Sequence, residues 1–222
     1  DARYVGFLWH TIVLAALAAL IVAALAAVLA AAERRRRNAF TRAAVRVARL
    51  GYAVPGAVLA VGIVIPLAAA DRVLATLFSS LAATPVTSVL AGTLTAVLIA
   101  YAVRFMAVGF APVESAMQRI TPAIEEAARG FGVGRLAVWR QVHWPMLRRG
   151  LVTAGILVFV DVMKEMPITL MTRPFGWDTM AVRIFEMTSE GEWERAALPA
   201  LAIVLVALVS LVVLTRQQEQ DG

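Results

Sequence analysis

Five long runs of apolar residues, four of them without a charged side chain, constrain the fold of this 222-residue chain most strongly. A helix of about 20 apolar residues crosses the hydrocarbon core of a bilayer, which is roughly 30 Å thick. We therefore predict an all-α polytopic membrane protein, a single domain over residues 1–222. Its five transmembrane helices are predicted at residues 11–32, 50–70, 86–103, 151–171 and 196–214.

The stretch between the second and third predicted spans has a different character. Residues 73–88 are uncharged but interrupted by Ser79, Ser80 and Pro85. Hydroxyl groups and a proline within a short apolar stretch are typical of a turn that does not cross the membrane. We expect a short interfacial or re-entrant turn here.

Composition supports a membrane environment and excludes several kinds of site. Hydrophobic residues make up 61% of the chain, above the roughly 45–50% of soluble domains. The absence of cysteine excludes disulfides, thiolate metal ligands and cysteine nucleophiles. The net charge of +6 comes from arginines between the apolar runs, which indicates contact with membrane lipid and not with nucleic acid.

The placement of arginine predicts the orientation. Seven arginines lie in residues 33–49 and seven in residues 104–149, and basic loops remain on the cytoplasmic side. Five spans then place the N-terminus outside and the C-terminus in the cytoplasm. The loop at 172–195 would lie outside, where Met180, Ile184 and Met187 recur at helical spacing and predict an amphipathic helix.

The cytoplasmic segment 104–149 is too long for a simple connection, and its pattern predicts two short helices. Thr121 and Pro122 are typical of an N-cap and a first helical residue. The glycine-rich stretch 130–134 predicts a turn, and a second helix would end near Pro145. This second helix would present an apolar stripe of Leu136, Trp139 and either Val142 or His143.

The spacing of residues within this segment resembles a known motif. The residues are Glu126, Ala127, Ala128, Gly132, Val142 and Pro145. They are similar to the EAA loop of binding-protein-dependent ABC importer permeases, E-A-A-x3-G-x9-I-x-x-P, with Val142 as a volume-conserving replacement of isoleucine. The resemblance implies a type I importer fold in which these six residues couple the permease to an ATPase. The alternative is an ordinary helical hairpin on the surface.

The resemblance also implies the partners. They are a cytoplasmic ABC ATPase, a second permease half or subunit and a periplasmic substrate-binding protein, assembled in the inner membrane of a bacterium. This chain itself is expected to be no enzyme and to hold no cofactor, because a P-loop requires a lysine and the single lysine, Lys164, lies in a predicted span. The partner ATPase would bind ATP and Mg²⁺.

The fourth predicted span contains three charged residues, Asp161, Lys164 and Glu165. Their spacing of three and four places them on one helix face, and the cost of charge at membrane depth predicts that they face inward. Two roles stay open, a lining of the translocation pathway or an internal salt bridge between helices. A metal site is not expected because the amine repels cations. Pro167 would kink the helix just beyond.

Several further segments are similar to the ferric-iron branch of these permeases, and in particular to the second half of a fused permease. The segments are 50–56, 163–167, 173–179, 183–184 and 192–199. A start at Asp1 instead of methionine would fit a segment of a longer protein. Ferric iron is the expected substrate, with thiamine, phosphonate or polyamine as alternatives. An ion-coupled secondary transporter and a lipid-binding scaffold are further alternatives that leave the EAA spacing unexplained.

Overall fold

The computed structural model describes residues 2–35, 38–82, 86–130, 132 and 134–219, and its regular structure in this part of the chain is entirely helical, as predicted. The elements are α1 (Ala2–Arg35), α2 (Ala39–Leu50), α3 (Gly56–Ala82), α4 (Leu94–Gln118), α5 (Pro122–Gly130), α6 (Arg135–Val138), the π-helical turn η1 (Trp139–His143), α7 (Trp144–Met163), α8 (Pro167–Thr172), α9 (Met180–Ser189) and α10 (Trp193–Glu219).

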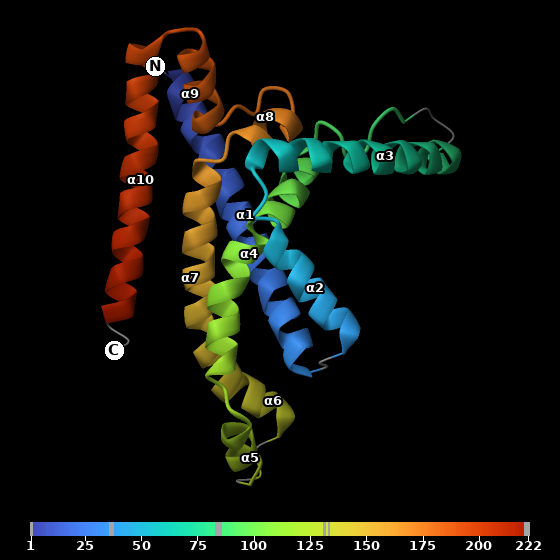
Figure 1. Ribbon diagram of the computed structural model, residues 1–222, viewed down its shortest axis with the longest axis vertical. Coiled ribbons are helices and arrows are strands. Elements are labelled where there is room, and N and C mark those ends of the chain that lie inside the picture. Colours follow the sequence, from blue (N-terminus) through green and yellow to red (C-terminus); the bar gives the residue numbers. More distant parts are fainter. Residues whose placement is uncertain (1, 36–37, 83–85, 131, 133, 220–222) are drawn as a thin grey trace.

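Three long helices, α1, α4 and α7, pack against one another and form the centre of the bundle (Figure 1). Helix α10 lies beside α7, and α9 lies at the end of the bundle where α1 begins. At the opposite end, α5 and α6 extend beyond the other helices, and α1 and α10 end on the same side. Apart from Arg104, which lies beside the turn before α3, the two arginine-rich segments therefore lie toward the same end of the molecule.

Large side chains fill two clusters along this bundle. Tyr101 and Phe105 of α4 lie in the cluster nearer the N-terminus of α1, together with Val158 of α7. Phe110 and Val113 of α4 lie in the cluster nearer α5 and α6. The same helix α4 thus contributes the largest aromatic side chains to both halves of the core.

Small residues allow the central helices to approach closely. A Cβ atom at Gly150 of α7 would lie 2.6 Å from the Cβ of Ala116 and 2.8 Å from the carbonyl oxygen of Pro112, both in α4. A Cβ atom at Gly109 of α4 would lie 2.5 Å from Cγ1 of Val22 in α1. Since lipid gives no hydrophobic driving force between helices, such close van der Waals contact is what holds them together.

The helix lengths agree in part with the predicted spans. Four helices, α1, α3, α4 and α10, are long and apolar enough to cross a membrane. Helix α7, which carries most of the fourth predicted span, has 20 residues, among them Arg148, Arg149 and Asp161. Helix α3 runs across the direction of the bundle, and only 17% of its most apolar stretch is buried (Figure 1).

The second and third predicted spans have different bounds from helices α3 and α4, because two charged residues are bound inside the protein. Helix α3 continues past residue 70 to Ala82, so the turn expected at residues 73–88 is largely helix. The Oδ1 atom of Asp71 accepts the N–H groups of Val89 and Leu90 at 2.7 and 2.5 Å, which satisfies its charge without ending the helix.

Helix α4 begins at Leu94 and not at residue 86, because Thr93 is its N-cap and accepts the N–H of Ala96. It also continues past residue 103 to Gln118, so the cytoplasmic segment is shorter than predicted. The sequence placed Arg104 outside the span as a charged residue, whereas in the structure it lies within α4 with its side chain 15% exposed. The predicted start of the next helix agrees with α5, which begins at Pro122.

The fourth predicted span differs from the structure, whereas the fifth span and the helix in the outer loop agree with it. Helix α7 ends at Met163, and Pro167 begins the separate helix α8 where a kinked continuation was expected. The fifth run lies within α10. The amphipathic helix expected in the outer loop is present as α9, with Met180 and Met187 buried, and its first N–H is donated to Oγ1 of Thr11 at 2.9 Å.

The contact at Gly150 has a matched control in the same helix. Gly150→Ala forces α4 and α7 apart, so we expect the free energy of unfolding to fall by about 1–3 kcal/mol. A Cβ at Gly155 meets nothing within 4 Å, so Gly155→Ala should cause no loss. Thermal unfolding in detergent would measure both, and equal stability of the two variants would contradict the close crossing.

Candidate functional site

Helices α5 and α6 form a small unit at the end of the bundle, connected to α4 on one side and to α7 on the other (Figure 1). Arg34, at the end of α1, holds the α4 side in place. Its Nη1 donates hydrogen bonds to the carbonyl oxygens of Met117 and Ile120 at 3.1 and 2.5 Å. The sequence predicted only an orienting charge here, but the guanidinium group binds carbonyl groups at and just beyond the end of α4.

The projecting part of the unit contains four of the six predicted coupling residues. Glu126 and Ala127 are exposed on α5, and Ala128 is half-buried. Gly132 follows α5 with φ +74°, the left-handed region in which glycine has no steric penalty. The predicted glycine turn between two short helices is therefore confirmed, and it presents the Glu126 face of α5 beyond the bundle.

Val142 and Pro145, the other two predicted coupling residues, lie where the unit meets the bundle. Val142 is in η1 and packs against the core cluster that contains Phe110. The second helix does not end near Pro145 as predicted, because α6 continues through η1 into α7. In η1 the N–H of Trp144 bonds the carbonyl of Trp139, and a π-helical turn relieves the clash that a proline ring makes with the preceding turn.

The predicted apolar stripe on the second helix is only partly covered. Leu136 is 81% exposed, and the rings of Trp139 and Trp144 are about half exposed and stack with centroids 6.0 Å apart. Of the residues in this stripe, Val142 packs against the core cluster that contains Phe110. The exposed side chains of Leu136, Trp139 and Trp144 therefore give this end of the molecule an apolar, aromatic surface, which is typical of contact with another protein.

The three charged residues of the fourth run do not share one helix face. Asp161 and Lys164 form an ion pair at 2.8 Å, in which the Lys164 side chain is 61% exposed. Glu165 follows the end of α7 and is buried, and its Oε1 accepts the N–H of Ile168 at 3.2 Å in the first turn of α8. The predicted common inward face is wrong because the helix ends at Met163.

Arg104 is the charged residue that faces Glu165. Its Nε lies 4.0 Å from Oε2 of Glu165, and its side chain is 15% exposed. Its Nη1 donates to the carbonyl oxygens of Gly51 and Val54, and the guanidinium group lies over the ring of Tyr52. The side chain thus joins α4 to the turn before α3 and to the break between α7 and α8.

Sequence reasoning missed the roles of Arg104 and Arg34. The signal for Arg104 was present, because apolar residues flank it on both sides from Tyr101 to Phe110. An arginine inside such a run has to find partners within the protein. In the described part of the chain, no three His, Asp or Glu side chains come together in a way that could hold a metal ion.

The family comparison agrees with this arrangement. Residues 19–220 match the family described as "Binding-protein-dependent transport system inner membrane component". The chain belongs to this family. The predicted resemblance to importer permeases is thereby confirmed, and the family is that of a membrane transport component and not of an enzyme.

Individual members of the family differ in the solute for which they are named. PhnV of Salmonella paratyphi A, a permease protein named for 2-aminoethylphosphonate transport, is 37% identical over 123 residues, 55% of this chain and 46% of its own length. Its counterpart in Salmonella typhimurium is 36% identical. The Fe(3+)-transport system permease protein FbpB 2 of Haemophilus influenzae is 24% identical over 120 residues, 54% of this chain and 24% of its own length. The chain spans less than half of each relative.

The two ion pairs of this permease predict different responses to mutation. Arg104→Ala leaves Glu165 buried without its facing cation, so the free energy of unfolding should fall by roughly 3 kcal/mol. Lys164→Ala removes an amine whose side chain is 61% exposed and leaves Asp161, 14% exposed, without its cation, so we expect a smaller loss of about 1 kcal/mol. Unfolding of both variants in the same detergent would measure the difference. A loss for Lys164→Ala as large as that for Arg104→Ala would contradict these assignments.

Proposed function

We propose that this chain is a permease unit of an ATP-driven ABC importer in a bacterial inner membrane. A periplasmic binding protein delivers the solute at the α9 end, a cytoplasmic ATPase docks on α5–α6, and a second permease half or subunit completes the pathway. The observation that carries this proposal is the projecting α5–α6 unit, with Glu126 exposed and Gly132 at φ +74°.

The orientation in this proposal places α5–α6 in the cytoplasm. Both arginine-rich segments lie at that end of the bundle, and basic loops remain on the cytoplasmic side. Helix α1 begins at the α9 end of the bundle and α10 ends toward the opposite end, which supports an N-terminus outside and a C-terminus inside. Closure of the ATPases would move α5–α6 and, through α4 and α7, change which side of the membrane the pathway faces.

Asp161 and Lys164 are the groups that we assign to the pathway. Their ion pair lies at the end of α7, and Lys164 remains 61% exposed in this chain. Glu165, in contrast, is buried against Arg104 and α8. We assign Glu165 to positioning α8 and not to contact with the solute.

An organophosphonate is the solute that the comparisons favour over ferric iron. The relatives named for 2-aminoethylphosphonate transport are 36–37% identical, whereas the Fe(3+) permease is 24% identical over a similar length.

Docking can be tested with two neighbouring glycines. Gly132→Ala places a side chain at positive φ and costs about 1 kcal/mol or more, so we expect about a fivefold smaller amount of co-purifying ATPase and slower uptake. Gly134→Ala is the control, because a Cβ there meets nothing within 4 Å and its φ is not in the strained region.

Membrane insertion of both variants would be checked by fractionation. Wild-type amounts of co-purifying ATPase and wild-type uptake with Gly132→Ala would refute docking on α5–α6. Equal loss in both glycine variants would instead indicate general damage to the segment and would equally count against a specific turn.

The solute can be tested in the native host. A strain deleted for this permease, with the full-length gene restored or carrying Gly132→Asp, would be assayed for uptake of 2-aminoethylphosphonate and of ferric iron. We expect the restored strain alone to take up the phosphonate. Uptake of iron without phosphonate would overturn the assigned solute and leave the importer assignment standing.

A further inference from the structure

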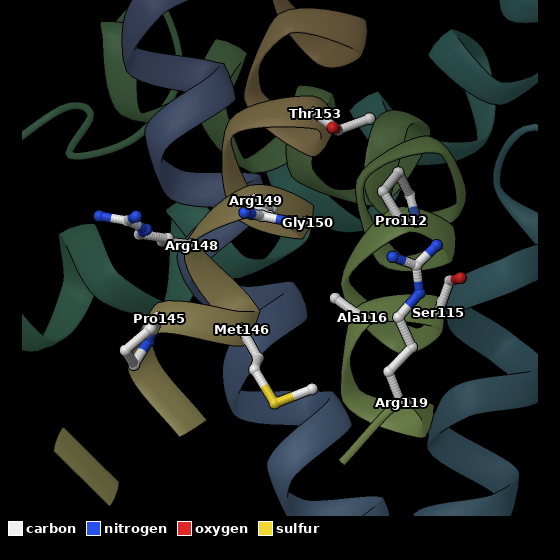
Figure 2. A pocket seen from close by; sticks show the side chains of 10 residues that line it. All are labelled: Pro112, Ser115, Ala116, Arg119, Pro145, Met146, Arg148, Arg149, Gly150 and Thr153. Carbon is white, nitrogen blue, oxygen red and sulfur yellow. The ribbon is translucent and has the colours of Figure 1, made fainter. Parts of the chain in front are cut away.

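A basic hollow lies between α4 and α7 at the level where the two helices lead into the α5–α6 unit (Figure 2). Its volume is about 660 Å³. Three arginines line it, Arg119 from the end of α4 and Arg148 and Arg149 from the first turns of α7. Pro145 is the one predicted coupling residue among its described lining residues, and neither Asp161 nor Lys164 lines it.

The charged side chains among the described lining residues of the hollow are all positive. Figure 2 shows Arg119 extending along α4 to the level of Ser115, with Arg149 beside Gly150 on α7 and Arg148 on another side of that helix. The hydroxyl-bearing residues Ser115 and Thr153 complete its polar lining, and none of its described lining residues is acidic. Guanidinium and hydroxyl donors together favour a ligand with several oxygen acceptors and negative charge.

The remaining lining is apolar. Pro112 and Ala116 from α4 and Met146 from α7 lie in the same hollow as the arginines. A small hydrated anion gains nothing from such a surface, whereas a lipid presents a charged headgroup and apolar carbons next to each other. The combination therefore favours a lipid over a free ion.

The hollow also lies where α4 leads toward α5, at the end of the bundle that the proposed orientation places in the cytoplasm. Residues 112–119 of α4 span roughly 10 Å along the helix, and the polar layer on each side of a bilayer is roughly 5–7 Å thick. Farther from α5–α6, α4 and α7 pack with α1 in the apolar cluster that contains Tyr101 and Phe105; toward α5–α6, the chain enters the polar helix α5. Basic pockets between helices at this level bind acidic lipid headgroups.

We infer that the hollow between α4 and α7 binds the phosphate group of an anionic phospholipid. Arg119 and Arg149 face it from the two walls, Arg148 contributes at the rim, and Ser115 and Thr153 donate hydrogen bonds. A lipid held there would bridge the two helices that lead into the coupling unit.

Native mass spectrometry of the full-length permease with its partners, in mild detergent, would test this inference. Phosphatidylglycerol and phosphatidylcholine would be added in equal amounts. We expect retained phosphatidylglycerol in the wild type and about fivefold less in Arg119→Gln, the change for one arginine near an anionic headgroup. Arg46→Gln is the control, because Arg46 is an exposed arginine of α2 at the same end of the molecule.

A second variant tests whether the lipid binds in the hollow itself or is only attracted by the positive charge of the arginines. Ser115→Leu keeps every arginine but fills part of the hollow, and it should also reduce the retained phosphatidylglycerol. Equal retention in Arg119→Gln and Arg46→Gln, or equal retention of the two lipids by the wild type, would overturn the inference. Displacement of the lipid by millimolar inorganic phosphate or 2-aminoethylphosphonate would overturn it in favour of a site for a free solute.

Discussion

Where α7 crosses α4, Gly150 brings the two backbones so close that a Cβ at this position would lie 2.6 Å from the Cβ of Ala116 and 2.8 Å from the carbonyl oxygen of Pro112. Contacts this close resist sliding, because interiors of this density have no space to absorb it. The same two helices lead directly into α5 and out of η1. Movement imposed on α5–α6 would therefore reach the centre of the bundle without passing through a flexible segment.

Local signals in the sequence were sufficient for the parts of the structure that depend on local geometry. Pro122 begins α5, Gly132 takes a positive φ, and Met180 and Met187 are buried on α9, all as their residue types and spacing indicate. Each depends on a preference of the backbone or on one helix face. The coupling motif could be recognised for the same reason, since its spacing reflects a helix, a turn and a second helix.

The predicted helix bounds that were wrong depend on contacts between residues far apart in the chain. Arg104 and Asp71 were expected to end apolar spans, yet each is bound by backbone groups of another segment and lies within a helix. Pro145 was expected to end a helix, yet a π-helical turn accommodates it. Glu165 does not share a helix face with Asp161, because α7 ends at Met163, before it reaches Glu165. Such partners cannot be read from periodicity, because the charge itself does not reveal what binds it.

The most direct test of the central claim uses the absence of cysteine from this chain. A single cysteine at Ala127, exposed on α5, would be cross-linked with a short bismaleimide in membranes that contain the whole transporter. We expect a product of permease and ATPase from Ala127→Cys and none from Ser189→Cys, which lies at the opposite end of the bundle on α9. Cross-linking of the ATPase from Ser189→Cys, or from neither position, would contradict docking on α5–α6.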